Sequence, residues 1–354
     1  MSTKFCILIT GGAGYVGSHT VIDLLKNGHE VVVVDNLCNT YCAKGEALPE
    51  SLKRAQEITG RSVVFYDVDI RNKDDLVTVF KNHKIDCVGH FAALKAVGES
   101  CIKPLLYYQN NITGTNVLLE VMAQNGVFHF LYSSSATVYG TPQCLPIPES
   151  HPTGSGCTNP YGKSKYFVEE ILKDLCTSDE KFAVICLRYF NPVGAHESGK
   201  IGEDPNGIPN NLMPYIAQVA VGKRDLVTVY GSNYDTKDGT GVRDYIHISD
   251  LSLGHVKALE MLMHPMFKGW KAYNLGTGQG YSVLEVIRAF SKSCGHEVKY
   301  KIGDRRLGDV ASCYADPTLA QNELHWRATK TLQDMCDDTW RWQKMNPEGY
   351  KPVN

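Results

Sequence analysis

Tyr161 and Lys165 stand four residues apart in a segment that we expect to be helical. Asn159 and Pro160 come just before them, in the order that begins many helices, so both side chains should lie on one face. A tyrosine has a pKa of about 10, and a lysine cation one turn away should lower it. The pair therefore predicts a general acid and base that works near neutral pH. The alternative is a surface helix with an incidental tyrosine and lysine.

Three serines, Ser133, Ser134 and Ser135, follow a predicted strand over residues 127–132. In an open parallel sheet, the end of a strand lies at the rim of the ligand crevice. A serine hydroxyl there can donate to the reacting oxygen or share its proton, and we expect Ser135 to do so. The alternative is a polar cluster that satisfies backbone groups at the end of a strand.

Gly11, Gly14 and Gly17 lie between a predicted strand over residues 4–10 and a predicted helix over residues 18–26. Their spacing suits a tight turn, backbone room for a pyrophosphate and close packing of the helix on the strand. Asp35 ends the next predicted strand, where an acid accepts hydrogen bonds from a ribose and favours NAD over NADP. These residues predict NAD binding. The alternative is a strand–helix turn whose glycines serve packing alone.

Predicted strands and helices alternate along the first half of the chain. This alternation predicts an α/β fold, a Rossmann-like doubly wound parallel sheet with helices on both faces. We expect residues 1–189 to form an NAD-binding domain. The predicted strands cover residues 4–10, 30–35, 62–66, 86–91, 127–132 and 182–187, and the predicted helices cover 18–26, 49–59, 74–82, 104–125 and 160–175.

The alternation changes near residue 190. Residues 190–354 predict mainly a smaller C-terminal α/β substrate domain, with parts of 243–275 returning to the first sheet and the ligand cleft between the two parts. Ser282 and Glu285 have the spacing of a capping box at a helix start. We expect a loop over 191–211, strands over 227–230 and 243–248, and helices over 212–221, 250–262, 282–294, from 316 onward and 332–345.

Composition limits the classes of partner. The 354 residues include 36 Lys and Arg against 38 Asp and Glu, and the net charge of −2 predicts no binding to nucleic acid or to an anionic membrane. The apolar runs are too short for a signal peptide or a membrane span. The twelve cysteines have no paired spacing, which predicts reduced thiols, no metal site and a cytoplasmic protein.

Eight segments together resemble the UDP-glucose 4-epimerase family, an extended branch of the short-chain dehydrogenases. The resemblance covers almost the whole chain and implies reversible interconversion of UDP-galactose and UDP-glucose, a reaction of galactose metabolism. It implies transient C4 oxidation to a 4-keto sugar by tightly bound NAD that is regenerated in each turnover. The segments are GGAGYVGSH (11–19), KAVGES (95–100), SSSATVYG (133–140), YGKSK (161–165), RYFNP (188–192), GIPNNLMP (207–214), DGTGVRDYIH (238–247) and YNLGTG (273–278).

The resemblance also implies roles for individual residues, with Tyr161, Lys165 and Ser135 catalytic. Two arginines suit a diphosphate because guanidinium forks match phosphate oxygens, although by position alone Arg243 could equally form a surface ion pair. The residues implied for NAD are Gly11, Gly14, Tyr15, Val16, Gly17, Asp35, Asn36, Leu37, Cys38, Asn39, Asp69, Ile70, Phe91, Lys95, Asn110, Lys165 and Tyr189. Those implied for the UDP-hexose are Ser135, Ala136, Thr137, Tyr189, Phe190, Asn191, Asn210, Asn211, Leu212, Thr228, Val229, Tyr230, Arg243, Arg306, Asp309 and Cys313.

Two other functions share these features. A nucleotide-sugar 4,6-dehydratase needs an added acid and base, usually Asp-Glu after the residue that matches Ser135, and this chain has Ala136-Thr137 there. A sensor on the same fold can lose the Tyr/Lys pair, which this chain keeps. Cys313 stands where some epimerases carry a bulky tyrosine, so UDP-N-acetylhexosamines are further expected substrates, unless Cys313 is a buried packing residue. The family also implies a homodimer joined near residues 104–125 and 160–175.

Overall fold

The computed structural model describes residues 3–306 and 308–352. The chain folds into two compact units, each formed by segments that are distant in sequence. The first unit holds the N-terminal residues through Gly140, together with Pro152–Arg188 and Ser252–Tyr273. The second holds Thr141–His151, Tyr189–Leu251 and the residues from Asn274 onward. Within the described ranges, no helix has both the length and the apolar character needed to cross a membrane.

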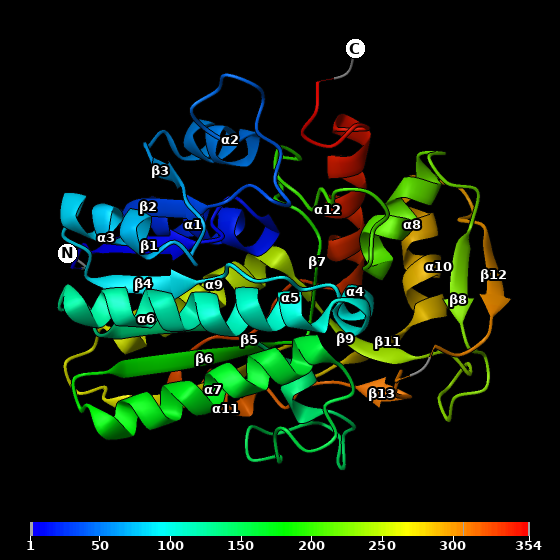
Figure 1. The fold of residues 1–354 in the computed structure, drawn as a ribbon. Coiled ribbons are helices and arrows are strands. Elements are labelled where there is room, and N and C mark those ends of the chain that lie inside the picture. Colours follow the sequence, from blue (N-terminus) through cyan, green and yellow to red (C-terminus); the bar gives the residue numbers. More distant parts are fainter. Residues whose placement is uncertain (1–2, 307, 353–354) are drawn as a thin grey trace. The chain divides into compact units, whose positions relative to one another are not determined.

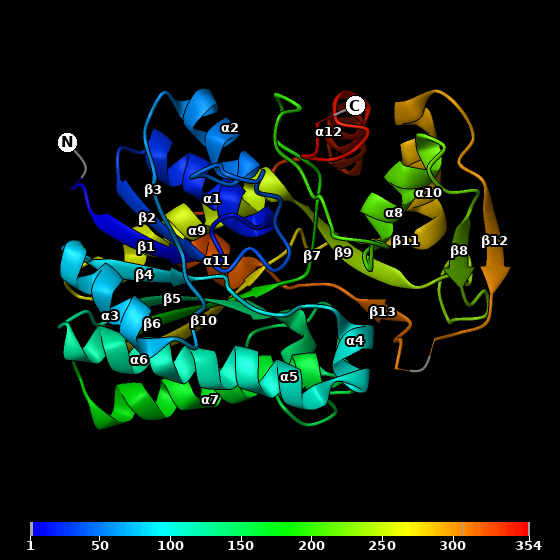
Figure 2. The ribbon, with the colours of Figure 1, turned by 45° about the horizontal axis from the view of Figure 1, so that its top comes forward.

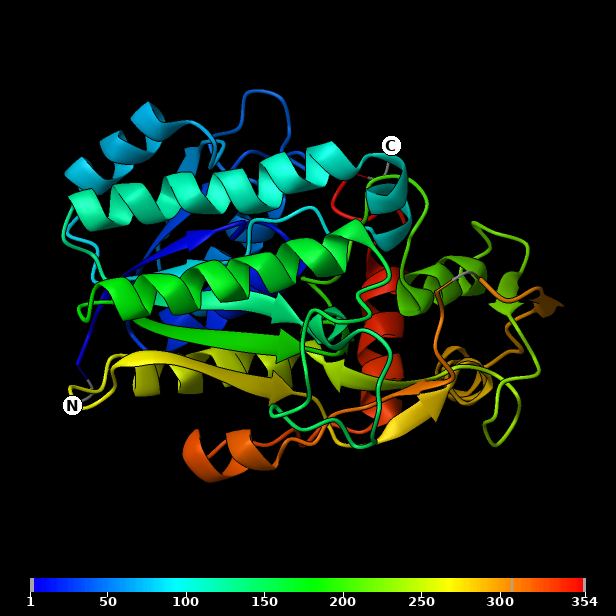
Figure 3. The same cartoon turned by 60° about the horizontal axis from the view of Figure 1, so that its bottom comes forward.

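The first unit is built on a seven-stranded sheet in the order β10-β6-β5-β4-β1-β2-β3. Parallel pairing is seen for β1 with β2 and β4, and the arrowheads of β5, β6 and β10 point the same way in Figure 3. The predicted doubly wound parallel sheet is therefore confirmed. The strands are β1 (Cys6–Thr10), β2 (Glu30–Asp35), β3 (Val64–Asp67), β4 (Cys87–His90), β5 (His129–Ser135), β6 (Ala183–Tyr189) and β10 (Gly269–Leu275).

Helices cover both faces of this sheet, as Figures 1 and 2 show. One face carries α3, α5, α6 and α7, and the other carries α1 and α9, which are joined where Ser252 Oγ donates to His19 O over 2.9 Å. The helices are α1 (Tyr15–Lys26), α2 (Glu50–Thr59), α3 (Lys73–Asn82), α4 (Val97–Ile102), α5 (Pro104–Tyr108), α6 (Gly114–Gln124), α7 (Pro160–Ser178) and α9 (Ile248–Leu262).

Apolar side chains on both sides of the strands form the core of the first unit. In β2 the run Val31–Val34 is fully buried, as a parallel strand covered on both faces requires. Leu118 and Met122 from α6 and Val168 and Leu172 from α7 pack against this sheet in one cluster. Burial of these apolar side chains fixes the position of α7 against the sheet. The positions of the polar residues on α7 are fixed with it.

The start of α7 follows its sequence signals. Asn159 caps the helix by accepting a hydrogen bond from Gly162 N over 2.8 Å, and Pro160 is the first helical residue. The prediction of one uniform helix over 104–125 is wrong in detail. A π-helical turn, η1 (Gln109–Thr113), separates α5 from α6. The extra residue in that turn places both Asn110 and Asn111 in buried positions.

The second unit has its own apolar core and two small sheets. One sheet has β9 in its centre, paired with β7, β11 and β13, and the other pairs β8 with β12. The strands are β7 (Asn191–Val193), β8 (Val227–Tyr230), β9 (Val242–His247), β11 (Gly280–Ser282), β12 (Tyr300–Gly303) and β13 (Ser312–Cys313). The helices of this unit are α8 (Leu212–Ala220), α10 (Val283–Cys294), α11 (Thr318–Glu323) and α12 (Leu332–Met345). The 3₁₀ helix η2 (Ala136–Tyr139) belongs to the first unit.

Local capping chemistry is confirmed in the second unit. Ser282 and Glu285 form the predicted capping box of α10, and α12 spans the predicted residues. The prediction of a loop over the whole of 191–211 is wrong at its start, where β7 pairs in parallel with β9. Strands of two to four residues such as β7 and β13 are defined by a distant partner, so their own sequence carries little signal for them.

Candidate active site

Lys165 lies inside the first unit, with only 3% of its surface exposed. Its ammonium donates a hydrogen bond of 2.5 Å to Ser133 O and lies 4.8 Å from the centre of the Tyr132 ring. Burial lowers the pKa of Lys165 to about 7, and the charges of Cys186 and Glu169 oppose this shift. The lysine cation is therefore held between the end of β5 and the helix that also carries Tyr161.

Tyr161 behaves differently from the sequence prediction. Burial raises the pKa of its phenol, and a hydrogen bond from Ser135 opposes that rise. The prediction of a lowered pKa for Tyr161 is therefore wrong. The physical reasons are that burial disfavours the charged phenolate and that the Lys165 ammonium donates its hydrogen bond to Ser133 O.

Ser135 connects the end of β5 to η2. Its Oγ accepts hydrogen bonds from Thr137 N (3.2 Å) and Thr137 Oγ1 (3.0 Å), and it caps this short helix. The remaining hydroxyl proton is the one that Ser135 can donate to the Tyr161 oxygen. The fold thus brings together Tyr161, Lys165 and Ser135, and it places Ala136 and Thr137 directly beyond Ser135 in η2.

The glycine turn has two positions fixed by packing and one that is open. A Cβ on Gly11, which has φ +69°, would lie 2.6 Å from Ala92 N, and one on Gly17 would lie 2.2 Å from Gly11 O. A Cβ on Gly14 would meet only Gly11 O, at 3.4 Å. The surface over Gly14 and the first turn of α1, where Tyr15 and Val16 begin the helix, can therefore accept phosphate groups. This geometry fits a dinucleotide.

The end of β2 is tied to this turn. Asp35 is buried and accepts hydrogen bonds from Ala13 N (3.1 Å) and Leu37 N (2.9 Å), and burial raises its pKa. Leu37 takes a positive φ of 56°, so the chain reverses directly after the strand. Cys38 N then donates to Asn36 Oδ1 over 3.2 Å. The carboxylate predicted to bind a ribose also holds the turn that would bind the phosphates.

A second acid lies beside the end of β2. Asn36 donates to Asp69 over 3.0 Å, and the Arg71 guanidinium makes two hydrogen bonds to the same carboxylate, which lowers the pKa of Asp69. The predicted residues 35–39 and Asp69 thus form one neighbourhood. Ile70, the next predicted contact, is buried.

Three further predicted NAD residues come from β4 and the segments after it. The Phe91 ring packs 4.9 Å from the ring of His255, and the Lys95 ammonium lies 5.9 Å from the Tyr15 ring. Asn110 is buried and donates to Asn111 over 3.0 Å. These residues extend the candidate cofactor surface from the glycine turn across to α7.

Asn111 is a structural member of the site that was not among the predicted residues. Its amide donates to Leu94 O and Ser164 Oγ, both over 3.0 Å, and accepts from Leu94 N over 2.9 Å. It therefore links the loop after β4 to the helix of Tyr161. No sequence pattern points to it, because it depends on the π-helical turn η1.

The second unit gathers the predicted diphosphate residues. Burial raises the pKa of Tyr245 to about 12, and Arg243 and Arg306 both oppose that rise, so both guanidinium groups act on one hydroxyl. Arg306 lies 4.8 Å from the Tyr230 ring, and its Nε donates to Asp309 over 2.9 Å. Two cations, one carboxylate and one exposed aromatic ring thus lie together, which suits a nucleoside diphosphate.

The remaining predicted substrate residues differ in what they can offer. Val229 is 1% exposed, so its side chain packs in the core and only its backbone could contact a ligand. Cys313 pairs with Arg243 across β13 and β9. Asn211 Nδ2 donates to Glu203 over 3.1 Å. The others are Tyr189 and Phe190, buried at the end of β6; Asn191, exposed on β7; Asn210 and Leu212, at the start of α8; and Thr228, on β8.

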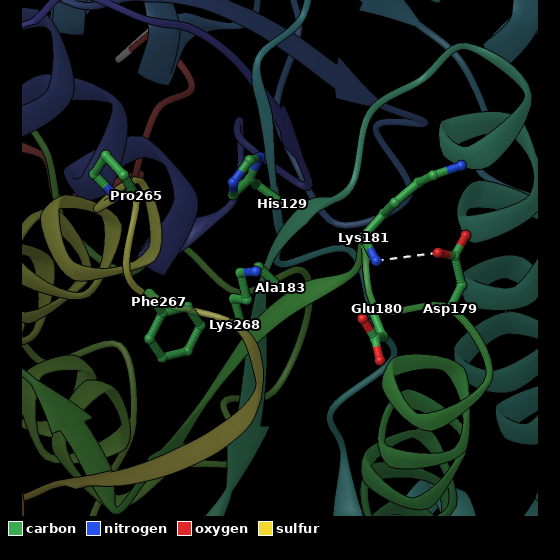
Figure 4. Close-up of a pocket in the computed structure, with 8 residues that line it drawn as sticks. All are labelled: His129, Asp179, Glu180, Lys181, Ala183, Pro265, Phe267 and Lys268. Atoms are coloured by element: carbon green, nitrogen blue, oxygen red, sulfur yellow. Dashed lines mark hydrogen bonds between the residues drawn. The ribbon is translucent and has the colours of Figure 1, made fainter.

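Figure 4 shows a pocket of the first unit at the amino-terminal ends of β5, β6 and β10. Lys181 N donates to Asp179 Oδ1 over 3.0 Å at its edge. The eight lining residues, none of them a predicted site residue, are His129, Asp179, Glu180, Lys181, Ala183, Pro265, Phe267 and Lys268. Parallel sheets bind ligands at the carboxyl ends of their strands, where Ser135 and the glycine turn lie, so this pocket is separate from the candidate site.

Comparison with known proteins identifies the family. Residues 8–339 match the family model described as GDP-mannose 4,6 dehydratase. The UDP-glucose 4-epimerase of Drosophila melanogaster is 65% identical over 97% of this chain and 98% of its own length. A crystal structure of UDP-glucose 4-epimerase from Bifidobacterium longum in complex with NAD+ and UDP is 53% identical, with a TM-score of 0.92 over 97% of this chain and 99% of that one.

A third relative extends the range of substrates in the comparison. The structure of the UDP-Glc/GlcNAc 4-epimerase from Campylobacter jejuni is 36% identical, with a TM-score of 0.80 over 96% of this chain and 99% of that one. The family model spans most of the chain, and the identity to the Drosophila enzyme selects the branch within it. The chain therefore belongs to the UDP-glucose 4-epimerase family.

Proposed function

We propose that the chain interconverts UDP-galactose and UDP-glucose by oxidising and re-reducing the sugar at C4. The observation that carries this proposal is the grouping of Tyr161, Lys165 and Ser135 at the carboxyl end of β5, in the same unit as a glycine turn with an open phosphate surface. The full-length similarity to UDP-glucose 4-epimerases, one of them with NAD+ and UDP, supports the same reaction.

NAD is the cofactor that these residues suit. Gly14 and the first turn of α1 would hold its pyrophosphate, and Asp35 would hold a ribose. When bound, NAD supplies a reversible two-electron acceptor for C4 of the sugar. It also adds positive charge, which favours the phenolate of Tyr161 and offsets the effect of burial.

The side chains then perform the proton transfers. Tyr161 takes the proton from the sugar O4, and Ser135 donates a hydrogen bond to the reacting oxygen. The hydrogen on C4 would leave with its electron pair to NAD+, so that a 4-keto sugar remains. Arg243 and Arg306 hold the diphosphate while the sugar turns about its link to that diphosphate and presents its other face. The hydride would return from the reduced cofactor to C4 as Tyr161 returns the proton to O4. Lys165 supports both steps as a nearby cation.

Incubation of the purified protein with UDP-galactose, without added NAD, tests this function. We expect UDP-glucose to form, because NAD regenerated in each turnover stays with the protein. Product only after NAD addition would keep the reaction and make the cofactor exchangeable. No epimer in either case would contradict the proposal, and a 4-keto-6-deoxy product would replace it with dehydration, for which Ala136 and Thr137 supply no acid.

We further propose that UDP-N-acetylhexosamines are substrates. Cys313 is only partly buried and small, and burial raises the pKa of its thiol to about 11, so it is a neutral side chain that leaves room for an acetamido group. The similarity to a UDP-Glc/GlcNAc 4-epimerase supports this range. Cys313 would then face the hexose beside Arg243.

Cys313→Tyr tests the substrate range. We expect kcat/KM for UDP-N-acetylgalactosamine to fall by roughly 10–200-fold, while that for UDP-galactose changes by less than about threefold, since only the larger sugar competes with the ring. Coupled assays of both substrates measure this difference. Cys313→Ser keeps the volume and should leave both values near those of the wild type, and equal losses for both sugars in Cys313→Tyr would contradict the assignment.

We propose a homodimer in the cytoplasm. Exposed apolar side chains gather on α4, α5 and α7 of the first unit: Val97, Ile102, Leu105 and Phe167, with Ile102 80% and Leu105 73% exposed. Covering such side chains with a second copy of the same helices removes apolar surface from water. A mass in solution of twice the 39.2 kDa chain would support this proposal.

A further inference from the structure

A buried ion pair lies next to the proposed reaction centre. Glu169 on α7 and Arg188 on β6 are 0% and 2% exposed. The guanidinium makes two hydrogen bonds to the carboxylate, of 3.0 Å from Nε and 2.7 Å from Nη2. Glu169 follows Tyr161 and Lys165 at four-residue intervals, so the three side chains form one stripe along α7.

The pair holds the Ser135 segment on both sides. Ser134, the residue before Ser135, donates to Glu169 Oε1 over 2.5 Å. Tyr139, the last residue of η2, receives a hydrogen bond of 3.0 Å from Arg188 Nη1, and its ring lies 4.9 Å from the guanidinium carbon. The four residues between these two contacts include Ser135 and Thr137, so their placement depends on the Glu169–Arg188 pair.

The pair also sets the charge around Lys165. Burial has the largest effect on the pKa of Lys165 and lowers it. The charges of Cys186 and Glu169 have smaller effects, and both raise this pKa. Burial lowers the pKa of His90, and the charge of Lys165 adds to that shift. The titratable and charged groups facing this site are Tyr161 and Glu169 on α7, His90 on β4, Tyr132 on β5, Cys186 and Arg188 on β6, and Tyr107 on α5.

We propose that Glu169 is a positioning residue for the reaction. It holds Ser135 in place from one side through Ser134 and from the other through Arg188 and Tyr139. Its carboxylate also balances the charge of Arg188 beside Lys165. It touches neither sugar nor cofactor in this proposal. The inference rests on the proposed function, because it takes Tyr161, Lys165 and Ser135 as the groups that carry the chemistry.

Glu169→Gln in the holoenzyme tests this role. The side chain keeps its shape and loses its charge. Arg188 keeps its hydrogen bond to Tyr139, but its positive charge near Lys165 and Tyr161 is no longer balanced by a carboxylate. Added positive charge lowers the pKa of both groups, and we expect the pH profile of kcat to move to lower pH by about one unit. We expect kcat at neutral pH to fall by roughly 10- to 100-fold, with KM for UDP-galactose little changed, because the lost contacts concern the reacting end.

A double variant separates charge from contact. Glu169→Gln with Arg188→Gln removes both charges, so the pH profile should return to that of the wild type while kcat stays low. Glu169→Asp keeps the charge and shortens the reach, so kcat should fall with an unchanged profile; this variant also serves if Glu169→Gln does not fold. Glu170→Gln, at the partly exposed neighbour that pairs with Lys173, is the matched control and should leave both quantities unchanged.

The outcomes are distinct. Wild-type kcat in Glu169→Gln, or a loss of kcat without any shift of the pH profile, would overturn the positioning role and leave Glu169 a residue of the core. Wild-type enzyme and Tyr161→Phe are measured alongside. Failure of the wild type to turn over UDP-galactose would overturn the proposed function instead, and full activity of Tyr161→Phe would overturn the catalytic role of Tyr161 on which this inference rests. Protein fold and NAD content are measured for each variant by circular dichroism and absorbance.

Discussion

Tyr161→Phe is expected to lower the turnover of UDP-galactose by about 10²–10⁴-fold, the range that a general acid and base supplies. The change removes one hydroxyl from a side chain that lies at the first turn of α7 and leaves the ring in place. Ser135 can still cap η2 through its contacts with Thr137, so the neighbouring geometry should persist. Initial rates with UDP-galactose, together with NAD content and UDP affinity, measure the effect.

The same helix offers a matched control for this prediction. Tyr166 lies five residues further along α7, and its ring packs against Gly154, where a Cβ would lie 2.4 Å from it. Tyr166→Phe removes the same hydroxyl group away from the three candidate catalytic residues, and we expect a rate close to that of the wild type. If Tyr161→Phe retained NAD, UDP binding and wild-type turnover, Tyr161 would not be the acid and base.

The local elements of this protein could be predicted because their signals are local. The run of valines in β2, the Asn159–Pro160 start of α7 and the Ser282–Glu285 capping box each act within a few residues. The π-helical turn that places Asn111 has no such local signal. The side-chain amide of Asn111 donates its hydrogen bonds to Leu94 and Ser164, which are distant in sequence. The Glu169–Arg188 pair joins a helix to a strand 19 residues away in sequence, and neither residue alone indicates it.

The error over Tyr161 has a similar origin. The spacing of Tyr161 and Lys165 is a property of the sequence, and it correctly places both on one helix. The pKa values depend on how many water molecules each group loses, which only the packing decides. Burial raises the pKa of Tyr161 and lowers that of Lys165 to about 7, so each group is shifted toward its neutral form.

Gly14→Ala should abolish NAD retention while leaving the fold intact. Gly14 has ordinary φ and ψ values of −74° and 178°, and the new Cβ would meet only Gly11 O at 3.4 Å, so the protein itself can accept a methyl group. That methyl group would fill the surface where we place the pyrophosphate. We expect NAD to bind about 100-fold more weakly, or roughly 2.7 kcal/mol, with a melting temperature of the NAD-free protein close to that of the wild type.

Substitutions at two other glycines serve as controls, because they separate an effect on the NAD-binding surface from an effect on protein stability or on the helix itself. Gly17→Ala places its Cβ 2.2 Å from Gly11 O, so it should destabilise the NAD-free protein by about 1–3 kcal/mol or more. Gly98→Ala, on α4 with nothing within 4 Å of its Cβ, should leave NAD binding unchanged and add about 0.5–1 kcal/mol of helix stability. Cofactor absorbance and thermal unfolding separate the three. A Gly14→Ala protein that keeps its NAD would show that the pyrophosphate does not lie over Gly14.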